Sequence, residues 1–104
     1  MSIMTTDVFR AIALALCFAV PASAHEAMSG WEYPIECCSG TDCYEIGAAD
    51  FETTDAGYRV KASGELIAWG DKRVRASGDG RFHRCSYGGK PEVATICFFV
   101  PGGA

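Results

Sequence analysis

Apolar residues follow two patterns along this chain: one continuous run near the start, and short alternating stretches after residue 30. Alternation has the two-residue period of a half-buried β-strand, whose successive side chains point to opposite faces. We predict short strands at residues 44–46, 58–61, 65–69, 72–75, 81–85 and 93–100. Residues 48–51 are ambiguous between a loop and one helical turn. The pattern predicts one small, mainly β domain (β-rich or α+β) with four to six strands.

Glycine-containing turns join the predicted strands, and all 12 glycines lie after residue 24. Ser63-Gly64 separates the second strand from the third, which predicts a hairpin. A turn that ends in Asp79-Gly80 separates the fourth strand from the fifth, and this dipeptide suits positive backbone angles. The last strand, residues 93–100, is the most apolar, so we expect it at the centre of the sheet.

One predicted strand contains a conflict. Strict alternation within residues 81–85 places Phe82 and Cys85 on opposite faces, although both side chains favour burial. Either a β-bulge lies between them, or Cys85 lies just beyond the end of the strand.

The continuous apolar run, residues 11–20, predicts a secretory signal peptide. Pro21 ends the run, and Ala22-Ser23-Ala24 supplies the small residues that a signal peptidase reads. A membrane anchor is the alternative, but spanning a bilayer takes about 20 apolar residues. We expect cleavage of residues 1–24 and export of residues 25–104 to the bacterial periplasm or beyond.

Six cysteines carry most of the candidate chemistry, and Cys17 lies in the predicted signal peptide. The other five form an early cluster and a late pair: Cys37, Cys38 and Cys43, then Cys85 and Cys97. Cysteines mostly pair in an oxidising compartment, so this odd number predicts two disulfides and one spare thiol. We favour bridges from two of the early three to the late pair. A local bridge from Cys43 to one of its neighbours is the alternative.

Charge and motifs narrow the function classes. The net charge is −4, which argues against nucleic acid or an anionic membrane surface as the main partner. The chain has no Gly-x-Ser-x-Gly, no phosphate loop and no carboxylate pair at a recognisable spacing. We therefore expect no enzyme and no membrane span after cleavage. The leading interpretation is an accessory or binding module whose partner is a protein or envelope component.

Basic and aromatic residues supply a candidate binding face. Five basic residues would gather on a hairpin over residues 72–85: Lys72, Arg73, Arg75, Arg81 and Arg84. The binding-face candidates are three of these and both tryptophans: Arg73, Arg75, Arg81, Trp31 and Trp69. A solvated, salt-bridged surface and ordinary aromatic packing are the alternatives.

Copper binding is an alternative function. If the mature chain begins at His25, its amine and ring nitrogen can chelate one ion, and copper favours nitrogen ligands. His83, the other histidine, could complete the site, and Met28 could add a soft sulfur. Zinc held by the cysteines and His83 fits less well, because disulfide formation competes for the thiols. A third hypothesis, suggested by chain size and disulfides alone, is a small inhibitor of a secreted enzyme.

Three blocks carry a resemblance: Tyr-Pro-Ile-Glu-Cys-Cys-Ser-Gly-Thr-Asp-Cys at 33–43, Ser-Gly-Asp-Gly-Arg-Phe-His-Arg-Cys at 77–85 and Cys-Phe-Phe-Val-Pro at 97–101. Together they resemble blocks found in small exported cysteine-rich bacterial proteins of unknown function. The resemblance implies one secreted domain, and it implies no particular activity.

Overall fold

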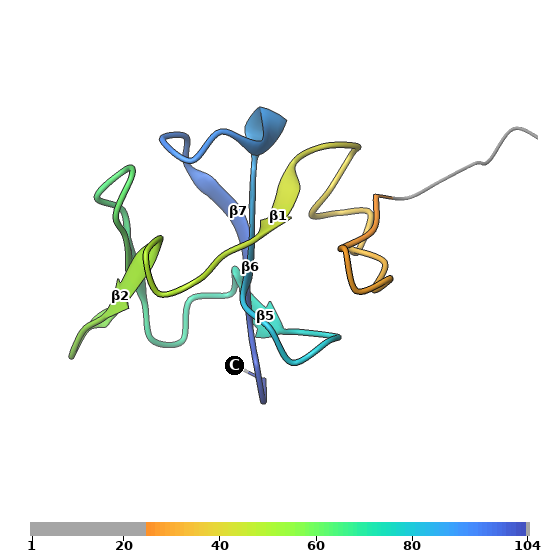
Figure 1. Ribbon diagram of the computed structural model, residues 1–104. Coiled ribbons are helices and arrows are strands. Elements are labelled where there is room, and N and C mark those ends of the chain that lie inside the picture. Colours follow the sequence, from red (N-terminus) through yellow and green to blue (C-terminus); the bar gives the residue numbers. More distant parts are fainter. Residues whose placement is uncertain (1–24, 104) are drawn as a thin grey trace, which may run out of the picture.

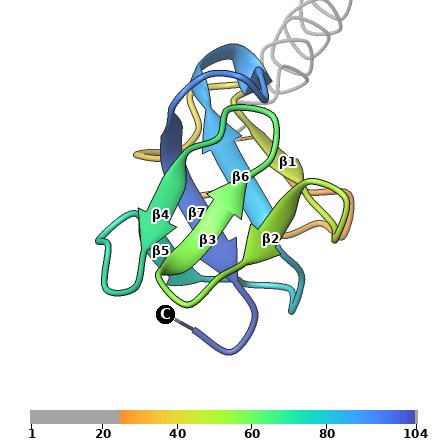
Figure 2. The same cartoon turned by 90° about the vertical axis from the view of Figure 1, so that its left-hand side faces the viewer.

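Seven short strands form two sheets that pack against each other (Figures 1 and 2). The computed structural model describes residues 25–103, so the predicted signal peptide lies outside the described residues. The strands are β1 Cys43–Glu45, β2 Phe51–Thr53, β3 Gly57–Val60, β4 Leu66–Ala68, β5 Val74–Ala76, β6 His83–Ser86 and β7 Thr95–Val100, with a 3-10 turn, η1, at Tyr87–Gly89. The prediction of a mainly β, disulfide-linked domain is confirmed, with one strand more than expected.

The larger sheet has the order β1-β6-β7-β5. Strand β6 pairs antiparallel with both β1 and β7, whereas β5 pairs parallel with β7. The predicted hairpin over residues 72–85 is therefore wrong, because β7 lies between β5 and β6. β7 is the most apolar strand, and an inner position buries it and lets both of its edges form hydrogen bonds. This outweighs the local preference for a hairpin. The predicted central place of β7 is confirmed.

The smaller sheet has the order β2-β3-β4. The hairpin of β3 and β4 around Ser63-Gly64 is confirmed, with Tyr58 opposite Ile67. The sequence did not predict β2, because only Phe51 of its three residues has a strongly apolar side chain. At the start of β3, a Cβ on Gly57 would collide with the carbonyl oxygen of Ile67. Glycine is therefore required where these two strands meet.

Both faces of the larger sheet are covered. On one face it packs against the smaller sheet through the inter-sheet core, which consists of Ile46, Val60, Ile67, Phe98 and Val100. On the other face lies an N-terminal segment, residues 25–42, drawn in orange and yellow in Figure 1. That face holds the disulfide core: Ala27, Tyr33, Cys37, Cys38, Cys43, Cys85, Cys97 and Phe99.

Two-sided burial resolves the conflict within residues 81–85, of which Phe82 lies just before β6. Cys85 belongs to the disulfide core, and Phe82 packs against the inter-sheet core on the other face. Neither a bulge between the two residues nor an early strand end is needed. The irregularity in the pairing of β6 with β7 comes later, between Cys85 and Ser86.

Candidate functional site

Two disulfides hold the disulfide core together, and they connect different parts of the fold. Cys43–Cys85 links residues that lie directly opposite each other on the paired strands β1 and β6. Cys37–Cys97 links the N-terminal segment to β7 across 60 residues of sequence. The structure thus contains the arrangement in which two early cysteines bridge to the late pair. Zinc on the cysteine cluster is excluded in this state, because four of the thiols are oxidised.

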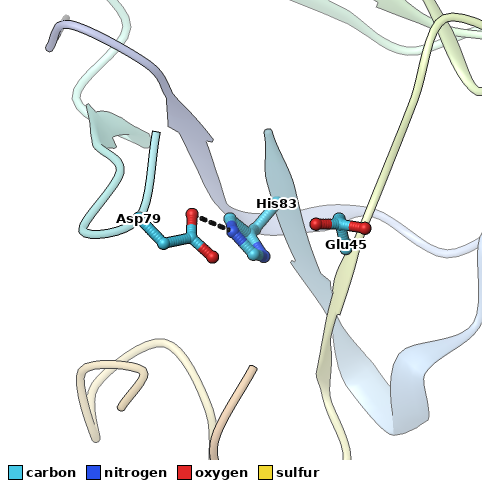
Figure 3. A group of neighbouring side chains, drawn as sticks. All are labelled: Glu45, Asp79 and His83. Carbon is cyan, nitrogen blue, oxygen red and sulfur yellow. Dashed lines mark hydrogen bonds and ion pairs between the residues drawn. The ribbon is translucent and has the colours of Figure 1, made fainter. Parts of the chain in front are cut away.

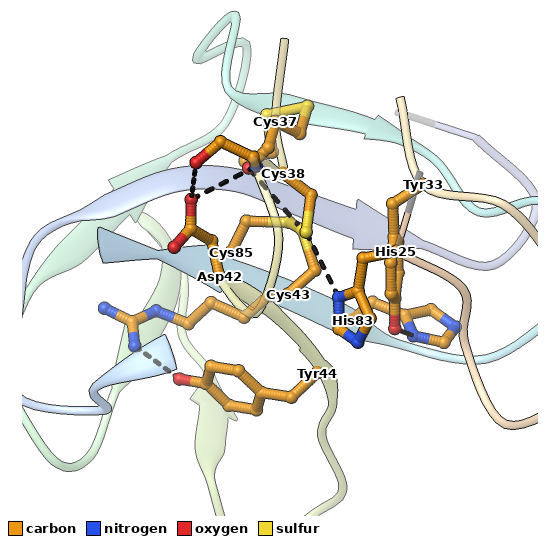
Figure 4. Close-up of a disulfide and its surroundings, with 12 residues drawn as sticks. His25, Tyr33, Cys37, Cys38, Asp42, Cys43, Tyr44, His83 and Cys85 are labelled. Atoms are coloured by element: carbon orange, nitrogen blue, oxygen red, sulfur yellow. Dashed lines mark hydrogen bonds between the residues drawn. A yellow bond between two sulfur atoms is a disulfide. The ribbon is translucent and has the colours of Figure 1, made fainter. Parts of the chain in front are cut away.

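Cys38 is the spare thiol among residues 25–103. It is 3% exposed, and Nδ1 of His25 lies 3.2 Å from its sulfur (Figure 4). The carbonyl oxygen of Gly40 lies 3.4 Å from the same sulfur. His25 is held from two sides, since its carbonyl oxygen accepts a hydrogen bond from the backbone N–H of Tyr33 and its ring packs on the Tyr33 ring. The sequence did not indicate this histidine–cysteine pair.

An ionised carboxylate lies close to this pair. Hydrogen bonds from the backbone N–H of Gly88 and from Ser39 lower the pKa of Asp42, and the nearby His25 ring adds to the effect. Cys38 and Asp42 also line a surface hollow of about 160 Å³. The buried thiol therefore lies beside a negatively charged hollow.

His83, the second candidate copper ligand, is fully buried with both ring nitrogens in hydrogen bonds. The Tyr33 hydroxyl lies 2.8 Å from Nδ1, and Oδ1 of Asp79 lies 2.7 Å from Nε2. Burial raises the pKa of Tyr33 to about 12, with the negative charge of Asp79 as the second cause. Tyr33 thus remains a neutral hydrogen-bond donor at any ordinary pH.

Asp79 is the centre of a polar network between the N-terminal segment and the larger sheet. Its carboxylate also accepts hydrogen bonds from the hydroxyls of Ser29 and Ser77 and from the backbone N–H of Arg81. Burial raises the pKa of Asp79, but the hydrogen bonds from Ser29, His83 and Ser77 outweigh it and hold the pKa well below its usual range. The network attaches residues 29–33 to the loop before β6.

Glu45 lies on the other side of the His83 ring from Asp79 in the view of Figure 3. Ligand atoms of Glu45, Asp79 and His83 come within 4.8 Å of one another, close enough to hold a metal ion. Glu45 is paired with Arg81 at 3.0 Å, however, and the Asp79 and His83 atoms are hydrogen-bonded to each other. This group satisfies its own polar atoms, which is the behaviour of a structural network.

The predicted copper ligands lie in different surroundings. His25 lies against Cys38, His83 is buried beneath Tyr33 and Trp31, and the Met28 side chain is fully exposed. His25 and His83 both contact the ring of Tyr33, from which each is separated by just over 5 Å between ring centroids. Copper binding itself stays a prediction.

The three arginines of the predicted binding face each have an acidic partner. Arg73 pairs with Glu65 and Asp71, Arg75 with Glu36, and Arg81 with Glu45, all at 2.8–3.0 Å. Hydrogen bonds from Arg73 lower the pKa of Asp71 to about 2. Because the hairpin does not form, the arginines occupy separate ion pairs.

The two tryptophans of the predicted face also differ. Trp31 is half-buried against Tyr33, His83 and Phe99. A Cβ on Gly78 would collide with its indole ring, so this glycine makes room for the N-terminal segment. Trp69 is exposed beside Tyr58 and borders a hollow of about 350 Å³. Of the two tryptophans, Trp69 is therefore the one whose side chain is exposed to solvent.

A pocket of about 320 Å³ opens between the two sheets, and we call it the inter-sheet pocket. Its apolar lining comes from both sheets and includes Tyr44, Ile46, Phe51, Val60 and Phe98. Asp50 and Lys61 are exposed polar residues of the lining, and Ala49 and Ala62 are exposed small ones. Sequence reasoning missed this pocket because it depends on the unpredicted strand β2.

One wall of the inter-sheet pocket contains a buried cation. Arg84 is 1% exposed, and its guanidinium donates to Thr95, Tyr44, Pro91 and Val93. The carboxylate of Glu65, from the loop just before β4, lies 3.8 Å away and supplies the counter-charge. Burial raises the pKa of Glu65, but hydrogen bonds from Thr95 and Arg73 outweigh it and leave the pKa below its ordinary value. Arg84 thus links the segments that form this wall of the pocket, and its N–H groups already have hydrogen-bond partners.

Comparison of the chain with protein-family models, curated proteins and solved structures finds no match. Within residues 25–103, no helix has the length and hydropathy of a membrane span.

Proposed function

We propose that the chain is an exported, non-catalytic binding module and that the inter-sheet pocket holds its ligand. The observation that carries this proposal is the pocket itself, an apolar hollow with a few polar groups at its border. Small-ligand sites have this composition, and their volumes begin at about 300 Å³. The pocket therefore suits a small ligand group, about the size of one aromatic ring.

The lining favours an aromatic group that carries a hydrogen-bond acceptor. Tyr44 and Phe51, which are both half-buried, offer ring faces and edges, which attract a further ring beyond simple area burial. The ammonium of Lys61 has one long contact, 3.4 Å to the carbonyl oxygen of Ala48, so it can turn to an incoming acceptor. The buried Arg84 keeps its existing partners. The source of the ring is either a free small molecule or a tyrosine side chain of an exported protein.

Export is supported by the disulfides and by the sequence before residue 25. Disulfides persist in oxidising compartments and are rare in the cytosol. Intact mass measured on protein recovered from the periplasm tests this part. The expected result is a chain that lacks residues 1–24 and contains two disulfide bridges. Full-length protein with five or six reduced thiols would contradict export.

Titration followed by NMR tests the pocket. Isotope-labelled protein is titrated with p-cresol, as the free ligand, and with the peptide Gly-Tyr-Gly, as the side chain. We expect chemical-shift changes in β2 and around Ala62. These changes should saturate with increasing concentration of the probe that represents the correct source. Changes spread over the surface, or none with either probe, would contradict the proposal.

A matched pair of variants localises the binding. Ala62→Phe places a ring in the pocket at an exposed position, so the fold is retained while the probe is excluded. Ala76→Phe makes the same change at an exposed position on β5 outside the pocket. The first variant should weaken binding at least about tenfold, which is about 1.4 kcal/mol of binding free energy, and the second should not.

A further inference from the structure

The ring of His25 presents Nδ1, and not Nε2, to the thiol of Cys38 (Figure 4). The choice of atom matters. In a histidine at the start of a chain, the α-amine and Nδ1 together close a six-membered chelate ring around one ion, whereas Nε2 points away from the amine. The nitrogen that would chelate with a free amine is thus the one that faces the buried sulfur.

We propose that His25 and Cys38 form a copper(I) site, with the Cys38 thiolate, Nδ1 of His25 and the α-amine of His25 as its three ligands. Soft thiolate sulfur suits copper(I), as it also suits zinc, and imidazole nitrogen suits copper. On binding, the Cys38 thiol releases its proton to solvent and the ion keeps its oxidation state. The site requires cleavage directly before His25, and it does not rest on the function proposed for the inter-sheet pocket.

The two side chains already have a spacing suited to shared coordination. Metal–nitrogen and metal–sulfur bonds of about 2.0 and 2.3 Å place neighbouring ligand atoms roughly 3–3.7 Å apart. The observed Nδ1–Sγ distance is 3.2 Å. Binding would therefore replace one contact with two bonds, without a rearrangement of the segment.

His25 is positioned independently of the thiol. Its carbonyl oxygen accepts a hydrogen bond from the backbone N–H of Tyr33 at 3.1 Å, and its ring packs on the Tyr33 ring. Two residues on, Ala27 is buried in the disulfide core. A first residue held in this way loses little further freedom when it binds an ion.

The surroundings favour a cation and limit oxidation of the thiol. The carboxylate of Asp42 lies near the pair and lines the same hollow as Cys38. That hollow gives a small ion a route to the sulfur, whereas the 3% exposure of Cys38 keeps larger thiols away. Two other candidate ligands are not suited, because both ring nitrogens of His83 are hydrogen-bonded and Met28 projects into solvent.

Competition with a chromogenic chelator tests the site. Protein exported to the periplasm is purified, and its intact mass is used to establish His25 as the first residue and the presence of two disulfides. Copper(I) is then titrated without oxygen in the presence of bicinchoninate. We expect one ion per chain and slower alkylation of Cys38 by iodoacetamide once the ion is bound. Failure of the wild-type protein to take copper(I) from bicinchoninate, or a different first residue, would overturn the proposal.

Three variants separate the ligands. Loss of an outer-shell partner alone weakens metal binding about 10–100-fold, so Cys38→Ser and His25→Ala should each weaken it at least about 100-fold. A chain processed one residue earlier, with Ala24 retained before His25, lacks the amine at the required position and should bind at least about tenfold more weakly. Met28→Ala is the matched control and should leave the affinity unchanged. Unchanged affinity in Cys38→Ser, with both disulfides intact, would exclude the thiolate as a ligand.

Discussion

The two faces of the larger sheet are buried by different means. The inter-sheet core lies between two hydrogen-bonded sheets and is made of aliphatic and aromatic side chains. The disulfide core lies beneath a segment with almost no regular structure and is made largely of cysteine, tyrosine and phenylalanine. One layer is held by its own strands, and the other by individual links to the sheet.

The links of the N-terminal segment are few and specific. They are the Cys37–Cys97 bridge, the hydrogen bonds of Ser29 and Tyr33 to the Asp79–His83 network, and the Trp31 ring against Gly78. A chain of this size gains only about 3–5 kcal/mol of stability from its core alone. A layer without strands must therefore be tied covalently and by buried polar groups, and its loss should be separable from global unfolding.

The adjacent residues Phe98 and Phe99 give the largest test of this difference. Both are fully buried, but they point to opposite faces of β7. Phe98→Ala should lower the free energy of unfolding by about 3–5 kcal/mol. Phe99→Ala should cost less within that range, because Trp31 and Tyr33 lie in an irregular segment that can collapse into the cavity.

Urea unfolding of the two variants measures the difference. The cost of a cavity rises with the volume that remains after relaxation, and two sheets fixed by hydrogen bonds relax little. A larger loss for Phe99→Ala than for Phe98→Ala would mean that the irregular layer is the more rigid of the two.

The two disulfides give the next largest effect. Replacement of either pair by alanine should lower stability by about 2–4 kcal/mol. The loops that they close span 60 and 42 residues, and loop-closure entropy for these lengths differs by only about 0.3 kcal/mol. The native-state consequences should nevertheless differ, because only Cys37–Cys97 joins the N-terminal segment to the sheet.

Limited proteolysis and hydrogen exchange under native conditions distinguish the pairs. Cys37→Ala/Cys97→Ala should expose residues 25–36 to cleavage while β6 and β7 stay protected. Cys43→Ala/Cys85→Ala should leave the same segment protected, since β1 and β6 remain hydrogen-bonded. Equal cleavage of both variants would contradict the assignment of the Cys37–Cys97 bridge as the link that holds the segment on the sheet.

Substitution of Asp79 has a smaller effect with a characteristic pH dependence. Asp79→Ala leaves the hydrogen-bond donors of Ser29, Ser77 and His83 without their acceptor, which should lower stability by about 1–3 kcal/mol at pH 7. Asp79→Asn keeps one acceptor oxygen and should lose less. Thermal unfolding at several pH values measures both.

The sign of the pH effect follows from the pKa of Asp79, which is lower in the folded chain than in the unfolded chain. The stabilisation is therefore complete above the unfolded-state pKa of about 3.9 and is lost as the pH falls towards the folded-state pKa. The wild-type advantage over Asp79→Asn should be constant near pH 7 and shrink below about pH 4. An advantage that grows on acidification would contradict the assignment of Asp79 as the ionised centre of the network.

The sequence predicted the parts of this fold that depend on local pattern. Alternation located β3, β4 and the central β7, and the cysteine count in an oxidising compartment predicted two bridges with a spare thiol. The sequence did not predict which thiol would be spare. Cys37 and Cys38 are adjacent, and the turn that directs one to β7 and the other to His25 has no periodicity.

Long-range placement limited the prediction of the site. The hairpin over residues 72–85 was expected because its turn is favourable, but pairing both edges of the apolar β7 outweighed that local signal. The inter-sheet pocket depends on β2, whose single apolar residue gives no alternation. Burial of Phe82 and Cys85 on opposite faces was the one sequence signal that the sheet is covered on both sides.

Exposed ion pairs should give the smallest effect, and they occur in both regions. Arg81–Glu45 bridges the loop before β6 to β1 beside the Asp79–His83 network, and Arg59–Glu52 lies across β2 and β3 of the smaller sheet. Arg81 is 65% exposed at its side chain and Arg59 is 44% exposed. Exposed pairs contribute about 0–1 kcal/mol, so Arg81→Ala and Arg59→Ala should each change stability by less than about 1 kcal/mol.

A double-mutant cycle at low and high salt isolates each pair. If the N-terminal layer depends on covalent and buried links alone, both cycles should give equally small, salt-screened coupling. A coupling for Arg81–Glu45 that is larger and persists in salt would mean that this pair belongs to the Asp79–His83 network and helps to hold the irregular layer in place.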